Sequence, residues 1–382
     1  MMNHSLSRRT FLGASAALPF GGALLNAAET QTAESKAVSK PTPLIHCTDL
    51  FHPHGDPDDH FDLASVFSLG YQGLVDLRGI GLDYPPARRV GDPDVMAVAQ
   101  LNRACGMTVP NVVGTSQFMT RRTDTLPDLP PWETASIRWI IDTLEKSDRP
   151  VAITIVGGST DVAIAALREP ELFRQKCAGV YLNAGATHPH KSNPNHLEMN
   201  VSINPAAYAA MFDLPCPLYW FPCWHTCEER ISNEWGTFYW MPHRDVFEGV
   251  ESTPLLGYFW YMFSRMVSPL WLRTTLVPPP EAEWNKILEG RRGMWSVASV
   301  FLLAGLTVTK TGKIVPTAEA GDDALFRMEH VKVECEDNGR LKWELSKEPT
   351  GRQVFHVLDV PSYPSAMTQA VRSLLLAFPK TV

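Results

Sequence analysis

The chain has 382 residues, with 34 basic and 41 acidic side chains and a formal net charge of −7. Apolar residues make up 45% and charged residues 20% of the sequence, which is typical of globular proteins and excludes the disordered, fibrous and disulfide-scaffold classes. The acidic balance argues against a nucleic-acid-binding protein, because such proteins usually carry a concentrated basic face. We therefore expect a folded protein with no nucleic-acid partner.

The N-terminus contains a motif typical of protein export. Residues 7–12 read Ser-Arg-Arg-Thr-Phe-Leu, which matches a twin-arginine export signal. The Gly- and Ala-rich stretch that follows is too short to span a bilayer and is interrupted by Pro19. Small residues at Ala27 and Ala28 offer a cleavage site. The motif predicts export by the twin-arginine route to the periplasm or another extracytoplasmic compartment.

The sequence predicts three segments of unequal length. Residues 1–28 are expected to be the signal peptide, and residues 29–42 a flexible leader, because they are rich in Ala, Thr, Ser, Lys and Pro. Residues 43–382 contain no repeat and no convincing linker, so we expect one domain. The apolar stretch at 254–276 contains two arginines and a proline, which indicates an amphipathic or buried helix rather than a membrane span.

Short apolar runs alternate with segments of helical periodicity along most of the domain. Strands are expected at residues 44–47, 75–82, 109–113, 151–156, 180–182 and 218–221. Helices are expected at residues 92–104, 132–144, 160–168 and 297–303, with a further helix that starts near Asp58. This alternation predicts an α/β fold with a mostly parallel central sheet flanked by helices, a Rossmann-like architecture.

The end of the chain has a different pattern. Residues 331–345, with Asn338-Gly339 at their centre, predict an antiparallel β-hairpin. A strand at 354–358 and a closing helix at 366–378 are expected to follow. In open α/β sheets ligands bind beyond the carboxyl ends of the strands, which directs attention to the loops after the earlier strands.

An acidic cluster follows the first expected strand. Asp49 ends that strand, and Asp56, Asp58 and Asp59 open the next helix. If these four carboxylates come together they repel one another, and a hard cation with oxygen ligands, such as Ca²⁺, would offset that repulsion. Alternatively, Asp58 and Asp59 form an exposed first turn that the helix dipole favours. The position of Asp49 at a strand end favours a binding site.

Histidines and cysteines offer weaker signals for a metal. His46, His52, His54 and His60 lie in the same stretch as the aspartates and could form a transition-metal site, but their spacing matches no standard zinc motif. We expect them to be exposed or hydrogen-bonded. The pair Cys223 and Cys227 lacks further ligands, so two thiols are favoured over a metal or a disulfide.

The acidic cluster also carries a resemblance to a known family. A strand that ends in Thr48-Asp49 and a helix that opens with Asp58-Asp59 resemble the first motifs of the inosine–uridine-preferring nucleoside hydrolases. These calcium enzymes cleave the N-glycosidic bond of nucleosides. The resemblance implies that Asp49 and Asp58 are catalytic, with Asp49 as the general base for water, and that Asp49 and Asp59 bind Ca²⁺.

Later motifs extend the resemblance over roughly residues 43–380. The turn at 157–161 resembles the family's Gly-Pro-Leu-Thr-Asn, whose Thr gives its main-chain carbonyl to calcium, so that role would fall on Thr160. Asn183 begins a strand end that resembles the family's Met-Gly-Gly-Ala. The family's Glu and Asn that hold the ribose hydroxyls correspond to Glu198 and Asn200. The resemblance implies that all three bind substrate.

Three features depart from the family pattern. Eight residues separate Asp49 from Asp58 where the family has three, so Asp56 is a candidate replacement ligand. The family's late His-Asp pair falls on Met294 and Trp295, which removes a calcium ligand and the histidine tied to protonation of the leaving group. The indole of Trp295 would instead offer a stacking platform for a sugar or base. The family's Asn after the second strand has no clear match.

The sequence therefore supports three functional hypotheses. The first is a metal-dependent hydrolase of N-glycosidic bonds in nucleosides or related ribosides, with Ca²⁺ as cofactor and a carboxylate-activated water. The second is a non-catalytic sugar- or nucleoside-binding protein of the same fold, because Met294 and Trp295 replace the family's pair. The third is a hydrolase of another substrate with a transition metal held by the histidines. In each case the partner is a small molecule, and a homo-oligomer is compatible with the sequence.

Overall fold

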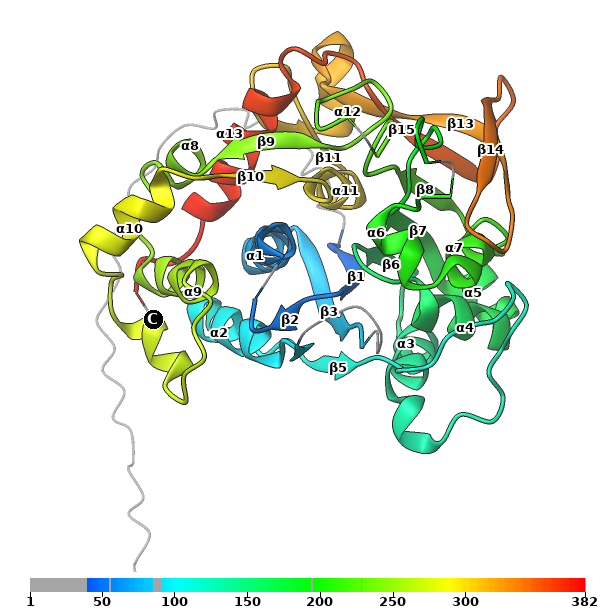
Figure 1. The fold of residues 1–382 in the computed structure, drawn as a ribbon, viewed down its shortest axis with the longest axis horizontal. Coiled ribbons are helices and arrows are strands. Elements are labelled where there is room, and N and C mark those ends of the chain that lie inside the picture. The colour runs from blue at the N-terminus through cyan, green and yellow to red at the C-terminus, as the bar shows by residue number, and fades with distance from the viewer. Residues whose placement is uncertain (1–39, 55, 85–90, 194, 228, 382) are drawn as a thin grey trace, which may run out of the picture. The chain divides into compact units, whose positions relative to one another are not determined.

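A nine-stranded sheet forms the centre of the fold (Figure 1). The structure is a computed structural model, and it describes residues 40–54, 56–84, 91–193, 195–227 and 229–381. The expected signal peptide and nearly all of the expected leader lie outside these residues. In sheet order the strands are β14 (Leu341–Leu345), β13 (Phe326–Cys335), β15 (Arg352–Val357), β8 (Leu218–Phe221), β7 (Cys177–Asn183), β6 (Val151–Ile155), β1 (Thr42–Thr48), β3 (Val75–Leu82) and β5 (Asn111–Val113).

The sheet is mostly parallel, as the sequence predicts. All neighbouring strands from β15 to β5 pair in parallel. Strand β13 pairs antiparallel with both β15 and β14, so the expected hairpin extends one edge of the sheet. Its turn follows Cys335, and Gly339 has a positive φ of 83° there, which glycine adopts without steric cost.

Helices cover both faces of the sheet, because successive residues of each buried strand point to opposite sides. Leu44 of β1 packs into one core and Ile45 into the other. The first core includes residues of α1 (Pro57–Tyr71), α2 (Val95–Cys105), α8 (His243–Phe247), α9 (Thr253–Phe263), α11 (Val297–Leu303) and α13 (Tyr363–Leu376). The second includes residues of α3 (Ala135–Lys146), α4 (Thr160–Arg168), α5 (Pro170–Lys176) and α7 (Pro205–Met211).

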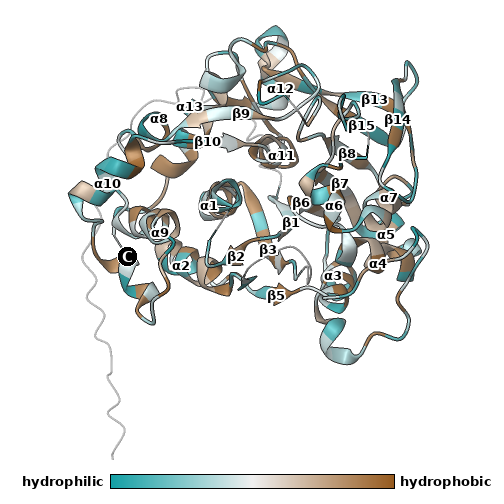
Figure 2. Cartoon of the chain, viewed as in Figure 1, coloured by the Kyte–Doolittle hydropathy of each residue, from teal (hydrophilic) through white to brown (hydrophobic). Residues whose placement is uncertain are grey.

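Smaller elements complete the chain. They are β2 (Phe51–His52), β4 (Asp92–Pro93), α6 (Met199–Ile203), β9 (Tyr239–Pro242), α10 (Glu281–Leu288), β10 (Arg291–Met294), β11 (Leu306–Val308), β12 (Ile314–Pro316) and α12 (Thr317–Ala320). Short 3₁₀ helices occupy Pro131–Glu133, Trp271–Leu276 and Gly321–Asp323. Hydrophobic residues gather on the central strands, whereas α8 and α10 at the periphery carry hydrophilic ones (Figure 2).

Several expected boundaries agree with the structure, and the differences have local causes. Strand β3, helix α4 and strand β8 have the predicted limits. Helix α2 starts three residues later than predicted, because Asp94 caps it by accepting a hydrogen bond from the Ala97 N–H. The apolar stretch at 254–276 forms α9 and a 3₁₀ helix. Across the described residues, no helix has the length and apolar character needed to cross a membrane.

Candidate active site

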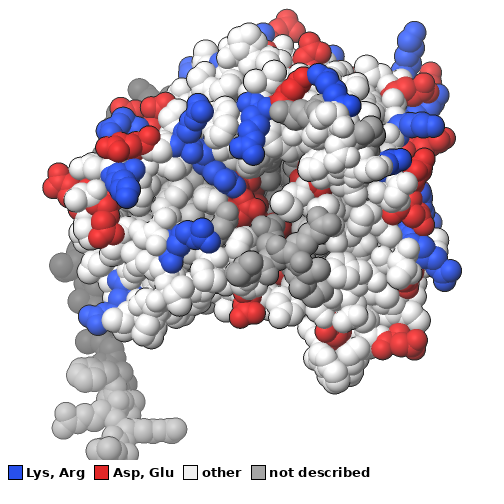
Figure 3. Space-filling model, in the orientation of Figure 1, with Lys and Arg blue, Asp and Glu red and all other residues white. Residues whose placement is uncertain are grey.

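An acidic cavity lies beyond the carboxyl end of β1. Asp49 follows this strand, and Asp58 and Asp59 lie in the first turn of α1, after Asp56. All four carboxylates line one cavity with a volume of about 760 Å³. Figure 3 shows acidic side chains inside a hollow of this face, with basic side chains near its rim. The expected clustering of the four aspartates is therefore present in the structure.

Arg292 of β10 reaches into this cavity and binds two of the aspartates. Its Nη2 lies 2.5 Å from Asp56 Oδ1, and its Nε donates to Asp58 Oδ1 at 3.0 Å. The guanidinium also lies over the ring of Trp295, 5.5 Å from the centroid. One cation thus offsets part of the charge of four carboxylates. Arg292 was not predicted from the sequence, although it lies only two residues before Met294.

The remaining negative charge is held in poorly solvated surroundings. Burial raises the pKa of Asp59 well above its usual range, and the charges of Asp56, Asp58 and Asp62 add to the shift. Asp62 lies one turn further along α1, fully buried, and its pKa is raised by burial and by Asp58. Arg292 opposes these effects at Asp59 without cancelling them. A second cation, or a proton on one of the carboxyls, would offset the remaining charge.

The oxygen donors at this position fit a calcium ion. Asp49 and Asp59 are only 2% and 4% exposed, and both line the cavity. Val156, directly after β6, lines it too, and its main-chain carbonyl accepts a hydrogen bond from Asn200 Nδ2 at 2.8 Å. A carbonyl oxygen has a second lone pair, and carboxylate and carbonyl oxygens are the ligands that Ca²⁺ prefers. Asp56, the expected replacement ligand, instead binds Arg292.

Thr160, expected to give its main-chain carbonyl to calcium, does not line the acidic cavity. It is the first residue of α4 and borders a separate small cavity with Asp83 and Asp161. A carbonyl in the first turn accepts a bond from within its own helix, so it points along α4. Val156, at the end of β6, lines the acidic cavity instead.

The two glycines after β6 bring the strand ends close together. A Cβ on Gly157 would lie 2.7 Å from Asp49 Cβ and 2.6 Å from Asp83 Oδ2. The N–H of Gly158 donates to Asp83 Oδ2. Asp83 follows β3, where the sequence showed no clear match to the family's Asn. The structure thus places Asp83 beside Asp49 as a polar neighbour that the sequence analysis did not assign.

Of the three residues expected to bind substrate through the later motifs, two line the cavity. Glu198 and Asn200 do so, whereas Asn183 is fully buried below it and donates to Ser299 Oγ at 3.0 Å. In this structure Asn183 supports the cavity from within the protein, and its expected contact with substrate remains a prediction. Glu198 also accepts a hydrogen bond from the Gly185 N–H at 2.8 Å and caps α6.

Asn200 ties two strand ends together. Its Nδ2 donates to the carbonyls of Val156 and Asn183 at 2.8 and 3.0 Å. These bonds fix the side chain at the base of the cavity, where the amide oxygen and the backbone of α6 are held in one orientation. The resemblance implied a role in ribose binding, and the structure adds a role in holding β6 against β7.

Aromatic side chains form another wall of the cavity. Trp295 and Trp224 both line it, with ring centroids 5.4 Å apart in an edge-to-face arrangement. Trp295 also contacts Phe238, whose centroid is 5.3 Å away. Met294 is fully buried in the hydrophobic core, where it has no access to a ligand. The departures from the family motif thus replace two polar groups by one cavity-lining indole and one core residue.

A second cavity of about 670 Å³ adjoins the first. Glu198, Cys227 and His196 line both cavities. His196 is exposed, and among the described residues it is the histidine that borders the acidic cavity. Nothing in its sequence context had marked it as functional. Among the described residues, neither Cys223 nor Cys227 forms a disulfide.

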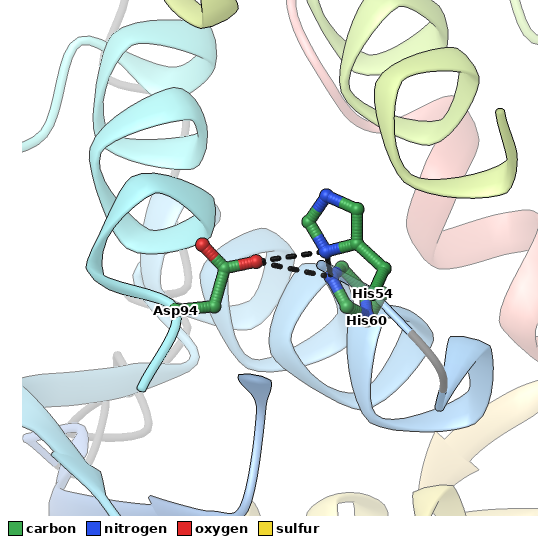
Figure 4. Close-up of side chains that lie close together, drawn as sticks. All are labelled: His54, His60 and Asp94. Carbon is green, nitrogen blue, oxygen red and sulfur yellow. Dashed lines mark hydrogen bonds and ion pairs between the residues drawn. The ribbon is translucent and has the colours of Figure 1, made fainter. Parts of the chain in front are cut away.

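Three of the four histidines around the acidic cluster lie next to one another, with ring centroids 4.9 Å apart for His52 and His54 and 4.8 Å apart for His54 and His60, whereas His46 lies apart in β1. His46 Nδ1 lies 2.7 Å from Thr154 Oγ1 inside the sheet, and His52 Nε2 donates to the Met266 carbonyl at 2.9 Å. His54 and His60 instead lie together with Asp94 (Figure 4). Asp94 lies inside the helix that was expected at residues 92–104, and its place beside the histidines was not predicted.

Comparison with solved structures agrees with this architecture. A purine-preferring ribonucleoside hydrolase from Gardnerella vaginalis has a TM-score of 0.52 at 16% identity, over 88% of this chain and 99% of the hydrolase. A plant nucleoside hydrolase gives 0.51 at 14% identity, over 87% and 99%. The type III effector protein XopQ, complexed with adenosine diphosphate ribose, gives 0.51 at 12%, over 88% and 94%. The chain has a nucleoside hydrolase-like fold.

At the level of sequence, no protein-family model and no curated protein matches this chain. The likeness is thus carried by the arrangement of strands and helices.

Proposed function

We propose that the protein hydrolyses the N-glycosidic bond of nucleosides or related ribosides. One observation carries the proposal: Asp49, Asp58 and Asp59 converge in a cavity at the carboxyl ends of a nucleoside hydrolase-like sheet. Ligands bind at this edge of open α/β sheets, and a volume of about 760 Å³ is ample for a nucleoside. The aromatic wall beside the acids suits a sugar or base.

The residues divide the chemistry among them. Asp49, nearly enclosed at the strand end, accepts a proton from the attacking water. Negative charge from the aspartates stabilises the oxocarbenium-like transition state. A bound calcium ion, held by Asp49, Asp59 and the Val156 carbonyl, would supply positive charge that lowers the pKa of a water and orients hydroxyl groups.

Sugar and base contact different walls. Glu198 and Asn200 accept and donate hydrogen bonds to sugar hydroxyls, because both already have fixed orientations at the cavity floor. Trp295 and Trp224 stack against the base. Met294 has no proton to give, so we assign the protonation of the leaving base to His196, which borders the cavity. We also propose export by the twin-arginine route, on the strength of the N-terminal motif.

A second candidate function is non-catalytic binding of a nucleoside or sugar. Arg292 favours it, because this side chain binds Asp56 and Asp58 and withdraws them from a ligand. Trp295 favours it as well, since it stands where the family has an anionic ligand. In this case Asp49 and Asp59 would contact sugar hydroxyls without turnover.

The two functions separate in a paired assay of catalysis and binding. Purified protein with and without Ca²⁺ is incubated with a panel of purine and pyrimidine nucleosides, and release of reducing sugar is followed over time. Calorimetry on the same panel measures binding. Turnover that disappears in Asp49→Asn supports hydrolysis. Binding without turnover, unchanged by a chelator, would favour the second function.

A further inference from the structure

We propose that His54, His60 and Asp94 form a buried site for a zinc-class divalent transition metal, separate from the acidic cavity. Their candidate ligand atoms all lie within 4.8 Å of one another, and the three side chains are at most 2% exposed. Figure 4 shows the two imidazole rings and the carboxylate turned toward a common point. This inference is independent of the hydrolytic activity.

The distances fit an ion held by three atoms. His54 Nδ1 lies 2.9 Å from Asp94 Oδ2, His60 Nε2 lies 3.7 Å from the same oxygen, and the two nitrogens are 3.1 Å apart. A triangle with these sides has a circumradius of about 1.9 Å. An ion slightly out of its plane would lie about 2.1 Å from all three atoms, which is the zinc–ligand distance for imidazole and carboxylate.

The proton balance also favours a cation. His60 Nδ1 contacts the Asp56 carbonyl at 3.2 Å, and a carbonyl only accepts, so this nitrogen donates a proton. The other nitrogen, Nε2, faces the cluster next to the carboxylate of Asp94, and a metal ion would take its lone pair. Within the described part of the chain, Asp94 Oδ2 makes no hydrogen bond of standard geometry, although His54 is in reach.

The site would hold the loop that carries the catalytic aspartates. His54 belongs to the stretch of eight residues between Asp49 and Asp58, where the family has three. His60 lies on α1 directly after Asp59 and holds the Asp56 carbonyl. Asp94 caps α2 through its other oxygen, which accepts from the Ala97 N–H at 3.0 Å. A metal here would fasten the lengthened loop to both helices, with water as a fourth ligand.

The test uses the full-length purified protein, stripped with a chelator and titrated with Zn²⁺ and with Co²⁺. We expect one equivalent to bind, with visible Co²⁺ bands typical of nitrogen and oxygen ligands, and a higher melting temperature. His54→Ala and His60→Ala should each weaken binding by at least about 100-fold, since even loss of an outer partner costs 10- to 100-fold. Asp59→Asn, which removes a ligand of the acidic cavity, and His356→Gln, which removes a distant histidine, should bind as the wild type does.

X-ray absorption at the zinc edge keeps the test decisive if the histidine variants fail to fold. Two imidazole nitrogens in the shell of the wild-type protein support the site. Three results would overturn the proposal. They are a metal shell made only of oxygen atoms, metal binding that is lost in Asp59→Asn but kept in His54→Ala, and no bound Zn²⁺ or Co²⁺ at tenfold molar excess. In the last case the cluster is a hydrogen-bonded triad.

Discussion

Two polar clusters include residues of the segment from the end of β1 to the first turn of α1, and their surroundings differ. Asp58 and Asp59 face an open cavity where Arg292 and the aromatic wall also lie. His54 and His60 lie beneath α9, where Tyr261 and Tyr258 pack against their rings. Polar residues of one short segment can therefore have different roles. Those left open to a cavity can contact a ligand, and those covered by another helix can stabilise the fold.

The largest expected effect is a loss of turnover when Asp49 of the acidic cavity is substituted. Asp49→Asn removes the general base but keeps the size of the side chain, so kcat should fall by about 10³-fold with substrate binding retained. Steady-state kinetics and calorimetry on one nucleoside measure both. Asp142→Asn, on the exposed surface of α3, is the control and should behave as wild type. Retention of more than about a tenth of the activity in Asp49→Asn would contradict the role of Asp49.

The aromatic wall should affect binding more than turnover. Trp295→Ala removes a stacking surface, and stacking of one base on an indole contributes about 1–3 kcal/mol, so affinity should fall by about 5- to 150-fold. The dissociation constant, measured by calorimetry, is the readout. Trp132→Ala removes an indole that is 76% exposed and far from the cavity lining, and it should leave affinity unchanged. Equal affinities for both variants would remove Trp295 from the site.

Arg292 sets how strongly the open cluster attracts a cation. Arg292→Gln frees Asp56 and Asp58 from their ion pairs, so Ca²⁺ affinity should rise by about fivefold while stability without Ca²⁺ falls. Melting curves with and without Ca²⁺ report both changes. The adjacent Arg291→Gln is a matched control, because Arg291 lies over the Trp240 ring and not in the cavity. A smaller calcium response in Arg292→Gln than in Arg291→Gln would show that Arg292 does not compete with the ion.

The stability of the protein should depend on pH through Asp161, a buried carboxyl outside the acidic cavity. Burial raises the pKa of Asp161 from 3.8 to about 7. The folded state therefore holds this proton more tightly, and its contribution to stability is full below about pH 4 and is lost as pH rises to about 7. Asp161→Asn should lack this loss. The free energy of unfolding of the variant, relative to that of the wild type, should therefore increase as pH rises from about 4 to about 7. Parallel denaturation curves for Asp161→Asn and wild type would contradict the burial effect.

Much of the fold could be predicted from the sequence, because apolar periodicity is a local property. The parallel strands, helix α4 and the hairpin around Gly339 follow directly from it. The position of Asp49 at a strand end likewise indicated the acidic cavity. The sequence could not show that Thr160 lies outside the acidic cavity, because a motif match does not say which main-chain carbonyl faces the cavity.

The remaining site residues depend on contacts between distant segments. Arg292 enters the cavity because β10 pairs with β9, and neither short strand is apparent from local periodicity. Asp94 meets His54 only because α2 begins beside the first turn of α1. His196 is marked by position alone, in an exposed loop next to Glu198. Such residues become visible when burial and neighbours are known.

The most direct test of the central claim is hydrolysis in H₂¹⁸O. Wild-type protein with Ca²⁺ is incubated with a nucleoside, and the sugar product is analysed promptly by mass spectrometry, with Asp49→Asn as the control. The proposed function predicts free base and ribose with one ¹⁸O introduced at the anomeric carbon beyond the label that free ribose acquires by exchange, and no product from the variant. Intact nucleoside across the whole panel would contradict hydrolysis and leave nucleoside binding as the function of the acidic cavity.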